Sequence, residues 1–228
     1  TGQNGTSSAL PFANKDVILR REILNNMHDE IQYIISGKSQ VRFGTNIRAA
    51  VGYLTGCEKS GAMDKTDKRF KQEETERLKK YIENQNLLIA TIDLYNYVSE
   101  GAEQKVYLKD SRTVLKLNDA IYYLSWVNYF INLLLHNHFF PDTAYNLLGF
   151  FESGTVVYAV VEQPFVKATE KTDLSHVEQF MHSNGFHKVQ NNDYFNPELG
   201  IILEDLHDEN VLTSNGILYF IDTVFHLK

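Results

Sequence analysis

The C-terminal stretch from Ile201 to Lys228 constrains the chain most. It reads IILEDLHDENVLTSNGILYFIDTVFHLK, and we expect it to form short strands on either side of a loop. Asp205 and Asn210 lie five residues apart on that loop, and Asp222 follows twelve residues later at the end of an apolar strand. Three oxygen-bearing side chains on such a frame can hold Mg²⁺ and accept a proton from an attacking hydroxyl. This pattern predicts that the rest of the chain supplies a nucleotide cradle and a lysine.

Composition excludes several classes of protein. The chain has 228 residues with 43% hydrophobic content, enough to bury one good core or two small ones. The formal net charge of −7 gives no basic face for nucleic acid, so we expect no nucleic-acid partner. The single cysteine, Cys57, excludes an internal disulfide framework and fits a reducing compartment.

No apolar run approaches the roughly 18 residues that a membrane-spanning helix needs. The first residues, TGQNGTSS, have neither a basic start nor an apolar segment, so no signal peptide is visible. We therefore expect no membrane partner and a cytoplasmic location.

The first ninety or so residues are expected to form a small helical extension without a catalytic cluster. A helical stripe runs from Val17 to Ser36, with Asp16 placed as its N-cap and Gly37 as its stop. A short second helix over Asn46–Leu54, a polar linker over Gly56–Lys68 and a charged helix over Arg69–Asn84 complete this part.

After Leu87 the pattern changes to short strands mixed with helices, which predicts an α+β chain. We expect a long helix from Asp119 to about His138 and a second helix over Thr172–Asn184. A hinge is expected near Glu162–Phe165. The strands are expected at Leu87–Ile92, Lys105–Leu108, Thr113–Leu117, Asn146–Phe151, Val156–Val161, Tyr194–Phe195, Gly200–Leu203, Val211–Leu212 and Ile217–Ile221.

Lys116 stands alone in the apolar strand Val114-Leu115-Lys116-Leu117. A lysine inside a strand either keeps its ammonium in water at a sheet edge or meets an anion, because an unpaired charge in a core is costly. Its position between the Ser99-Glu100-Gly101 turn and the expected helix start at Asp119 favours the second explanation, with nucleotide phosphates as the anion.

Several of these segments together resemble protein-kinase-like enzymes. SEGAEQKVYL and TVLKL are similar to the glycine loop and lysine strand, YAVVEQPFV to the last strand and hinge of the N-lobe, LEDLHDENVL to the catalytic loop, and YFID to the strand ending in the metal-binding aspartate. The combination resembles most the small serine/threonine/tyrosine-kinase-like domain of bacterial and phage polyvalent proteins, over roughly Glu74 to Lys228.

The resemblance implies a role for each matching residue. Lys116 would pair with the α- and β-phosphates of ATP, and Asp205 would orient or deprotonate the acceptor hydroxyl. Asn210 and Asp222 would hold Mg²⁺. The remaining cofactor-binding residues implied are Gly101, Ala102 and Glu103 over the phosphates, and Glu162, Gln163 and Phe165 at the adenine.

The implied fold is a β-rich N-lobe with one long helix, a hinge and a reduced C-lobe, preceded by the helical extension. The corresponding division places the extension at 1–72, the N-lobe at 73–161, and the hinge with a reduced C-lobe at 162–228.

The sequence departs from the kinase pattern at two places. No glutamate occurs between Asp119 and Phe151, so the usual lysine–glutamate ion pair lacks its acid. The candidate substitutes are Asp119, Asn128, Asn132 and Glu103. Leu203-Glu204 stands where the pattern has His-Arg, which removes the anchor for a phosphorylated activation loop. His207, inside the catalytic-loop segment, is expected to brace that loop.

Three hypotheses follow. The first is an ATP- and Mg²⁺-dependent kinase that transfers the γ-phosphate to a hydroxyl acceptor, either protein or small molecule. The second is a pseudokinase that binds nucleotide or a protein partner without catalysis, favoured by the missing helix glutamate. The third is an unrelated α+β interaction protein whose EDLHDEN segment is only an acidic turn, in which case Lys116 and Asp222 should not converge near Asp205.

Overall fold

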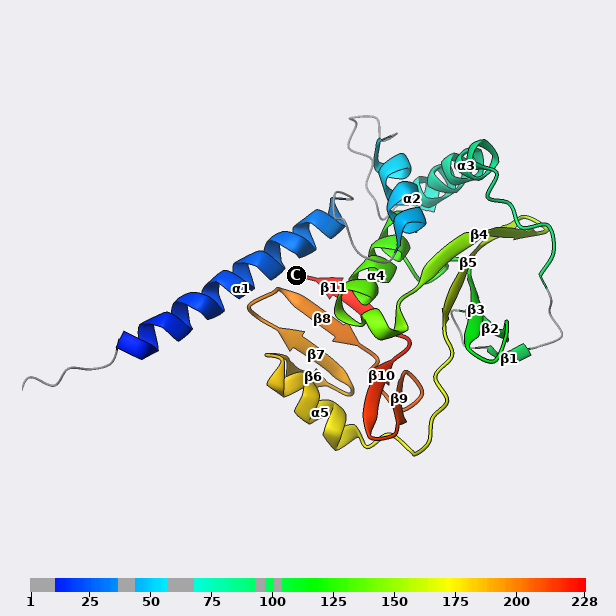
Figure 1. The fold of residues 1–228 in the computed structure, drawn as a ribbon. Coiled ribbons are helices and arrows are strands. Elements are labelled where there is room, and N and C mark those ends of the chain that lie inside the picture. The colour runs from blue at the N-terminus through cyan, green and yellow to red at the C-terminus, as the bar shows by residue number, and fades with distance from the viewer. Residues whose placement is uncertain (1–10, 37–43, 57–67, 93–96, 101–103) are drawn as a thin grey trace, which may run out of the picture.

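The computed structural model describes residues 11–36, 44–56, 68–92, 97–100 and 104–228. They form helices and antiparallel sheets, which confirms the α+β prediction (Figure 1). The helices are α1 (Pro11–Ile35), α2 (Thr45–Gly56), α3 (Lys68–Gln85), α4 (Trp126–Phe139), the short 3₁₀ helix η1 (Pro141–Thr143) and α5 (Leu174–Ser183). Within this part of the chain, no helix has the length and apolar character needed to cross a membrane.

The strands form three antiparallel sheets. A five-stranded sheet has the order β1-β2-β3-β5-β4, a four-stranded sheet the order β11-β8-β7-β6, and β9 and β10 form a hairpin. The strands are β1 (Tyr97–Glu100), β2 (Gln104–Leu108), β3 (Thr113–Asn118), β4 (Asn146–Ser153), β5 (Val156–Pro164), β6 (His187–Gln190), β7 (Asp193–Asn196), β8 (Ile201–Glu204), β9 (Val211–Ser214), β10 (Ile217–Phe220) and β11 (Val224–Leu227).

The hydrophobic core lies around α4. The largest cluster of buried residues joins α4 to α2, to the C-terminal end of α1, to one face of the five-stranded sheet and to the C-terminal strands. Trp126 and Phe130 of α4 pack against Phe150 of β4, with ring centroids about 6 Å apart. The rest of α1 extends away from the body of the molecule (Figure 1). Helix α4 therefore occupies the position from which it can fix both sheets.

The prediction that a long helix starts at Asp119 is wrong. The structure places the first residue of α4 at Trp126, because Ser125 is the N-cap and its side chain accepts the N–H of Asn128. Asp119 instead accepts the N–H of Ile121 in the preceding loop. Asp119 and Ser125 can both cap a helix. The contacts of α3 with the start of α4 favour the helix that begins after Ser125.

Helix α3 fixes the start of α4 through a buried carboxylate. Glu74 accepts hydrogen bonds from the backbone N–H groups of Trp126 (2.6 Å) and Val127 (3.2 Å). These amides have no partner within their own helix, and a negative charge is favourable at a helix N-terminus. Lys71 of α3 donates to the carbonyl of Tyr123, and Thr75 accepts the indole N–H of Trp126. The β3–α4 loop is thus attached to α3 at several points.

Replacing Glu74 with alanine is expected to lower the free energy of unfolding by about 2 kcal/mol, because two buried helix amides lose their acceptor. Urea unfolding followed by far-UV circular dichroism measures the change. Glu76→Ala is the matched control on the same helix. Glu76 is exposed and pairs with Lys79 at 3.0 Å, so its removal should change stability by less than about 0.5 kcal/mol. Equal effects of the two substitutions would contradict this account of the α4 terminus.

The predicted strand over Leu87–Ile92 is also wrong. This segment makes a single bridge between Leu88 and Phe150 and otherwise runs across β4 without a strand partner. Gly149 permits the crossing, because a Cβ at that position would lie 2.4 Å from the carbonyl oxygen of Leu87. The segment covers the outer face of the five-stranded sheet, where Ile89 and Ile92 pack on a small second cluster.

Other elements differ from the sequence expectation in their limits. Helix α1 begins at Pro11, before the predicted cap at Asp16, while the predicted stop at Gly37 lies outside the described residues. Strand β1 includes Ser99 and Glu100, which were expected in a turn. Strands β6 and β11 have no counterpart in the expected strands. Strand β5 continues to Pro164, beyond the division at residue 162.

Candidate active site

Lys116 lies in the middle of the five-stranded sheet. Its strand, β3, pairs with β2 and β5, and Lys116 faces Val106 and Val161 across the two ladders. Only 3% of the residue is exposed. The ammonium donates to the carbonyl oxygen of Ile221 (2.8 Å) and to the hydroxyl of Tyr145 (3.3 Å). Burial lowers the pKa of Lys116, and the nearby charge of Asp222 offsets part of that effect.

Asp222 lies just after β10, and its carboxylate is close to the Lys116 ammonium. Its Oδ2 lies 3.9 Å from the Lys116 ammonium, and the same oxygen accepts a hydrogen bond from the side chain of Gln104. Gln104 is the first residue of β2 and lies in the Gly101–Lys105 turn that the resemblance places over the phosphates. No sequence signal indicated that its side chain contacts Asp222. The end of β10, the middle of β3 and the start of β2 therefore meet at one place.

The loop after β8 holds Asp205 in a tight turn. Asp205 has a φ of 68°, and its N–H donates to the carboxylate of Asp193 at 3.0 Å. A left-handed conformation is unusual for a residue other than glycine and is found at turns and functional sites. The side chain of Asp205 is 62% exposed. The loop thus presents this carboxylate to solvent on a fixed backbone.

Asn210 and His207 hold the side chain of Asp205. The amide nitrogen of Asn210 donates to the carbonyl oxygen of Asp205 (2.9 Å) and to its Oδ2 (3.2 Å). His207 Nδ1 accepts the N–H of Glu209 at 3.2 Å, and its Nε2 lies 3.3 Å from Asp205 Oδ1 and 3.2 Å from the Asn210 amide nitrogen. These contacts agree with the expected bracing role of His207.

A backbone hydrogen bond joins the two halves of the site. The N–H of Ile221 donates to the carbonyl oxygen of Asn210 at 2.9 Å, at the end of the β9–β10 hairpin opposite its turn. Asn210 is therefore adjacent to the residue before Asp222. The backbone of Ile221 thus links the Lys116–Asp222 pair to the Asn210–Asp205 pair.

The other expected cofactor-binding residues are Gly101, Ala102 and Glu103 before β2, and Glu162, Gln163 and Phe165 at the end of β5 and after it. Gly101, Ala102 and Glu103 lie outside the described residues. Glu162 and Gln163 belong to β5, where the Glu162 carboxylate contacts Lys109 at 2.6 Å and the Gln163 amide donates to the carbonyl of Thr143. Phe165 is partly exposed just after β5, and its N–H donates to the carbonyl of Arg112.

A pocket of about 520 Å³ lies beside the end of β5. Glu162, Gln163 and Pro164 line it together with the start of α2 and with Arg112. None of Lys116, Asp205, Asn210 and Asp222 lines this pocket. The Lys116–Asp222 pair therefore lies outside this pocket.

Comparison with known proteins identifies the family. The family model described as a serine/threonine/tyrosine kinase found in polyvalent proteins matches residues 71–228, which is most of the chain. The chain belongs to this family. This confirms the resemblance of the sequence to the kinase-like domain of polyvalent proteins, and the matched range is close to the expected one. Searches of curated proteins and of solved structures found no match.

The kinase family pattern has a helix glutamate that pairs with the lysine, and the structure shows what stands in its place. The candidate substitutes for this glutamate that lie among the described residues are wrong, because their side chains bond groups other than Lys116. Asp119 caps its own loop, Asn128 bonds Ser125, and Asn132 bonds the backbone of Phe225. Glu103 lies outside the described residues. Tyr145, which precedes β4, contacts Lys116 instead, and no sequence signal pointed to it.

Helix α4 places His136 beside Tyr145 in its neutral form. His136 is 1% exposed, its Nε2 donates to the carbonyl of Thr143 (3.0 Å), and its Nδ1 accepts from the hydroxyl of Thr223 (2.8 Å). Burial, followed by the charge of Lys116, lowers the pKa of His136 from 6.5 to about 3, while the bond to Thr143 acts in the opposite direction. Helix α4 thus places an uncharged imidazole against Tyr145 and contributes no carboxylate partner to Lys116.

The neutral His136 predicts a loss of stability in mild acid. Its folded pKa of about 3 lies below the ordinary value of 6.5, so the unfolded chain binds this proton first as the pH falls. The contribution is complete above pH 6.5 and declines toward pH 3, by about 1.4 kcal/mol per pH unit well below 6.5. Urea unfolding between about pH 7 and pH 5 measures this slope.

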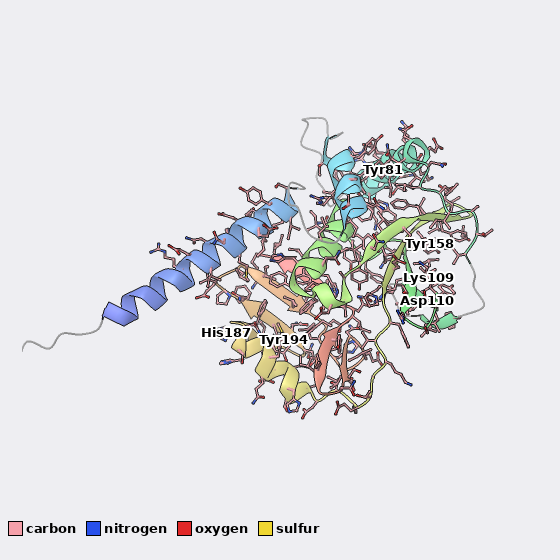
Figure 2. All side chains as sticks on the ribbon, in the orientation of Figure 1. Tyr81, Lys109, Asp110, Tyr158, His187 and Tyr194 are labelled. Carbon is pink, nitrogen blue, oxygen red and sulfur yellow. The ribbon has the colours of Figure 1, made fainter. Side chains whose placement is uncertain are left out.

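His136→Gln should be less stable at neutral pH, because it loses buried contacts, but should show a flatter pH dependence than the unaltered chain. His187→Gln is the control, because His187 is exposed on β6, away from α4 (Figure 2). That variant should keep the slope of the unaltered chain. An unchanged slope in His136→Gln would show that other groups cause the acid sensitivity.

Proposed function

We propose that this chain is an ATP-dependent phosphotransferase that uses Mg²⁺ to transfer the γ-phosphate to a hydroxyl acceptor. Its membership in a kinase family supports the general class. The observation that carries the proposal is that the backbone of Ile221 joins the Lys116–Asp222 pair to the Asn210–Asp205 pair. An unrelated protein with only an acidic turn predicts that Lys116 and Asp222 do not converge near Asp205, and the 3.9 Å separation of Lys116 and Asp222 supports the proposal over that alternative.

The surroundings of Lys116 fit an anionic ligand. Two of its ammonium protons are directed to neutral oxygens, the carbonyl of Ile221 and the hydroxyl of Tyr145. The carboxylate of Asp222, at 3.9 Å, lies beyond hydrogen-bond distance. A buried cation with such incomplete neutralisation is stabilised by a further negative charge. Phosphate oxygens of ATP would supply that charge.

The residues of the loop and of β10 fit Mg²⁺. This ion prefers oxygen ligands, and proteins often supply only one or two of them besides the phosphates and water. Asp222 offers a carboxylate. Asn210 directs its amide nitrogen to Asp205, which leaves the amide oxygen for the metal. When bound, the ion would neutralise charge on the phosphates.

Asp205 would accept the proton of the acceptor. The hydroxyl oxygen of the acceptor forms a bond to the γ-phosphorus, the bond between that phosphorus and the bridging oxygen of ADP breaks, and the hydroxyl proton passes to the Asp205 carboxylate. His207 and Asn210 hold that carboxylate in position. Catalysis of this type depends on positioning and charge more than on a shifted pKa. The acceptor would be a protein or a small molecule.

A pseudokinase is the second candidate, and two observations favour it. Lys116 pairs with no helix glutamate among the described residues, and Gln104 already donates to the Asp222 carboxylate that the metal would need. Such a chain would bind nucleotide or a protein partner without catalysis.

Thermal unfolding with and without millimolar ATP tests nucleotide binding for both candidates, because a ligand of the folded state raises the melting temperature. We expect stabilisation by ATP that increases with Mg²⁺. Incubation with ATP labelled on the γ-phosphate then separates them, since only the phosphotransferase moves label to itself or to an added hydroxyl compound. A melting temperature that ATP leaves unchanged, with Mg²⁺ or Mn²⁺ present, would contradict the phosphotransferase and a pseudokinase that binds nucleotide.

A further inference from the structure

The hydroxyl of Tyr145 is the closest side-chain contact of the Lys116 ammonium. Its oxygen lies 3.3 Å from the Lys116 nitrogen, and the ammonium is 5.3 Å from the centre of the Tyr145 ring. The same hydroxyl donates to the carbonyl of Ile221 (2.8 Å), which is also the backbone acceptor for Lys116. Lysine, tyrosine and carbonyl therefore form a closed triangle next to Asp222.

Helix α4 holds Tyr145 in this position. The N–H of Tyr145 donates to the side chain of Asn137 (2.6 Å), and the Asn137 amide donates back to the Tyr145 carbonyl (2.8 Å). The rings of His136 and Tyr145 lie with centroids 4.6 Å apart. Asn137 and His136 are neighbours on α4 and both are buried. The helix thus acts on Lys116 indirectly, through a residue outside the helix.

We infer that Tyr145 is the positioning residue for Lys116 and replaces the helix carboxylate that the sequence lacks. This inference rests on the proposed function, because it concerns how Lys116 meets the phosphates of ATP. A neutral hydroxyl fixes the ammonium without neutralising it, so more of its charge remains for the phosphates than in an ion pair. The chain can therefore dispense with a glutamate on α4.

The test compares the affinities of ATP and adenosine in four proteins: the unaltered chain, Tyr145→Phe, Lys116→Met and the double variant. Phenylalanine keeps the ring that packs on His136 and removes only the hydroxyl. We expect Tyr145→Phe to weaken ATP binding about 5-fold, the effect of one hydrogen bond, and to leave adenosine binding unchanged. In the Lys116→Met background the same substitution should change ATP binding by less than about 1.5-fold, because its effect acts through the lysine.

Tyr194→Phe serves as the matched control. Tyr194 is equally buried, on β7, and makes no contact with Lys116 or Asp222 within the described residues. The loss of the Tyr194 hydroxyl in this variant should leave the ratio of ATP affinity to adenosine affinity unchanged. A purely structural role for Tyr145 would lower both affinities together or act equally in both backgrounds, and either result would overturn the inference.

A spectroscopic measurement on the unaltered chain makes the test independent of how well the variants fold. The ring-carbon resonance of Tyr145 in tyrosine-labelled protein should shift when ATP is added and stay in place with adenosine. A resonance that ATP leaves unmoved would overturn the inference. If Lys116→Met weakens ATP binding but Tyr145→Phe does not, the inference fails while the proposed function stands. If Lys116→Met leaves ATP binding unchanged, both fail.

Discussion

Replacing Asp205 with asparagine is expected to lower phosphoryl transfer by about 100- to 10,000-fold, the usual contribution of a positioned general base. Asparagine has nearly the same shape but cannot accept the acceptor proton at neutral pH. The backbone of Asp205 would keep its bonds to Asp193 and Asn210, so the loop should remain in place. Transfer of labelled γ-phosphate measures the rate, and the thermal shift with ATP measures whether nucleotide binding survives.

Asp208→Asn is the matched control, because Asp208 lies on the same loop and contacts only the exposed Lys171 at 3.4 Å among the described residues. This variant should transfer phosphate at close to the unaltered rate. Equal transfer by Asp205→Asn and the unaltered chain would remove Asp205 as the proton acceptor. A chain that binds ATP and transfers no label in any form would support the pseudokinase instead.

Replacing Lys116 with methionine is expected to lower transfer at least about 100-fold while leaving the folded state about as stable as before, because removing the cost of a buried ammonium is offset by the loss of a partner of the Asp222 carboxylate. Methionine fills a similar volume and removes the cost of burying an ammonium. The carbonyl of Ile221 keeps the hydroxyl of Tyr145 as a donor, so no buried acceptor is left without a partner. A residue that is costly for stability but needed for function is typical of an active site.

Lys109→Met provides the comparison, because Lys109 lies on the exposed β2–β3 turn (Figure 2) and pairs with Glu162 at 2.6 Å. This variant should change stability by less than about 1 kcal/mol and should not affect transfer. Strong destabilisation by Lys116→Met would show that the lysine is a structural residue. Full transfer by that variant would exclude Lys116 from the phosphate site.

From the sequence, the relative placement of Asp205, Asn210 and Asp222 could be predicted better than the contacts that other elements make with the site. Asp205 and Asn210 are close in sequence, and Asp222 is placed by a hairpin whose turn, Asn215-Gly216, has the positive φ angles that such turns require. These groups are therefore brought together by local structure. Tyr145 and Gln104 approach Lys116 and Asp222 only through the packing of distant elements, which no local pattern encodes.

The difference between local pattern and long-range contact also explains which elements of the fold were predicted wrongly. The β4–β5 hairpin, α2 and α5 have clear periodicity and turns, and they lie close to their expected limits. The start of α4 depends on Glu74, which lies more than fifty residues earlier in the chain. The apolar Leu87–Ile92 segment was expected to form a strand, but it packs over the outer face of a sheet instead. Long-range contacts decide both cases.

A structure of the chain with Mg²⁺ and a non-hydrolysable ATP analogue tests the central claim most directly. We predict the metal between the side-chain oxygens of Asn210 and Asp222, the Lys116 ammonium on the phosphates, and the terminal phosphate facing Asp205. Nucleotide bound elsewhere, for example in the pocket beside Arg112, with the Lys116 ammonium touching no phosphate, would contradict the account.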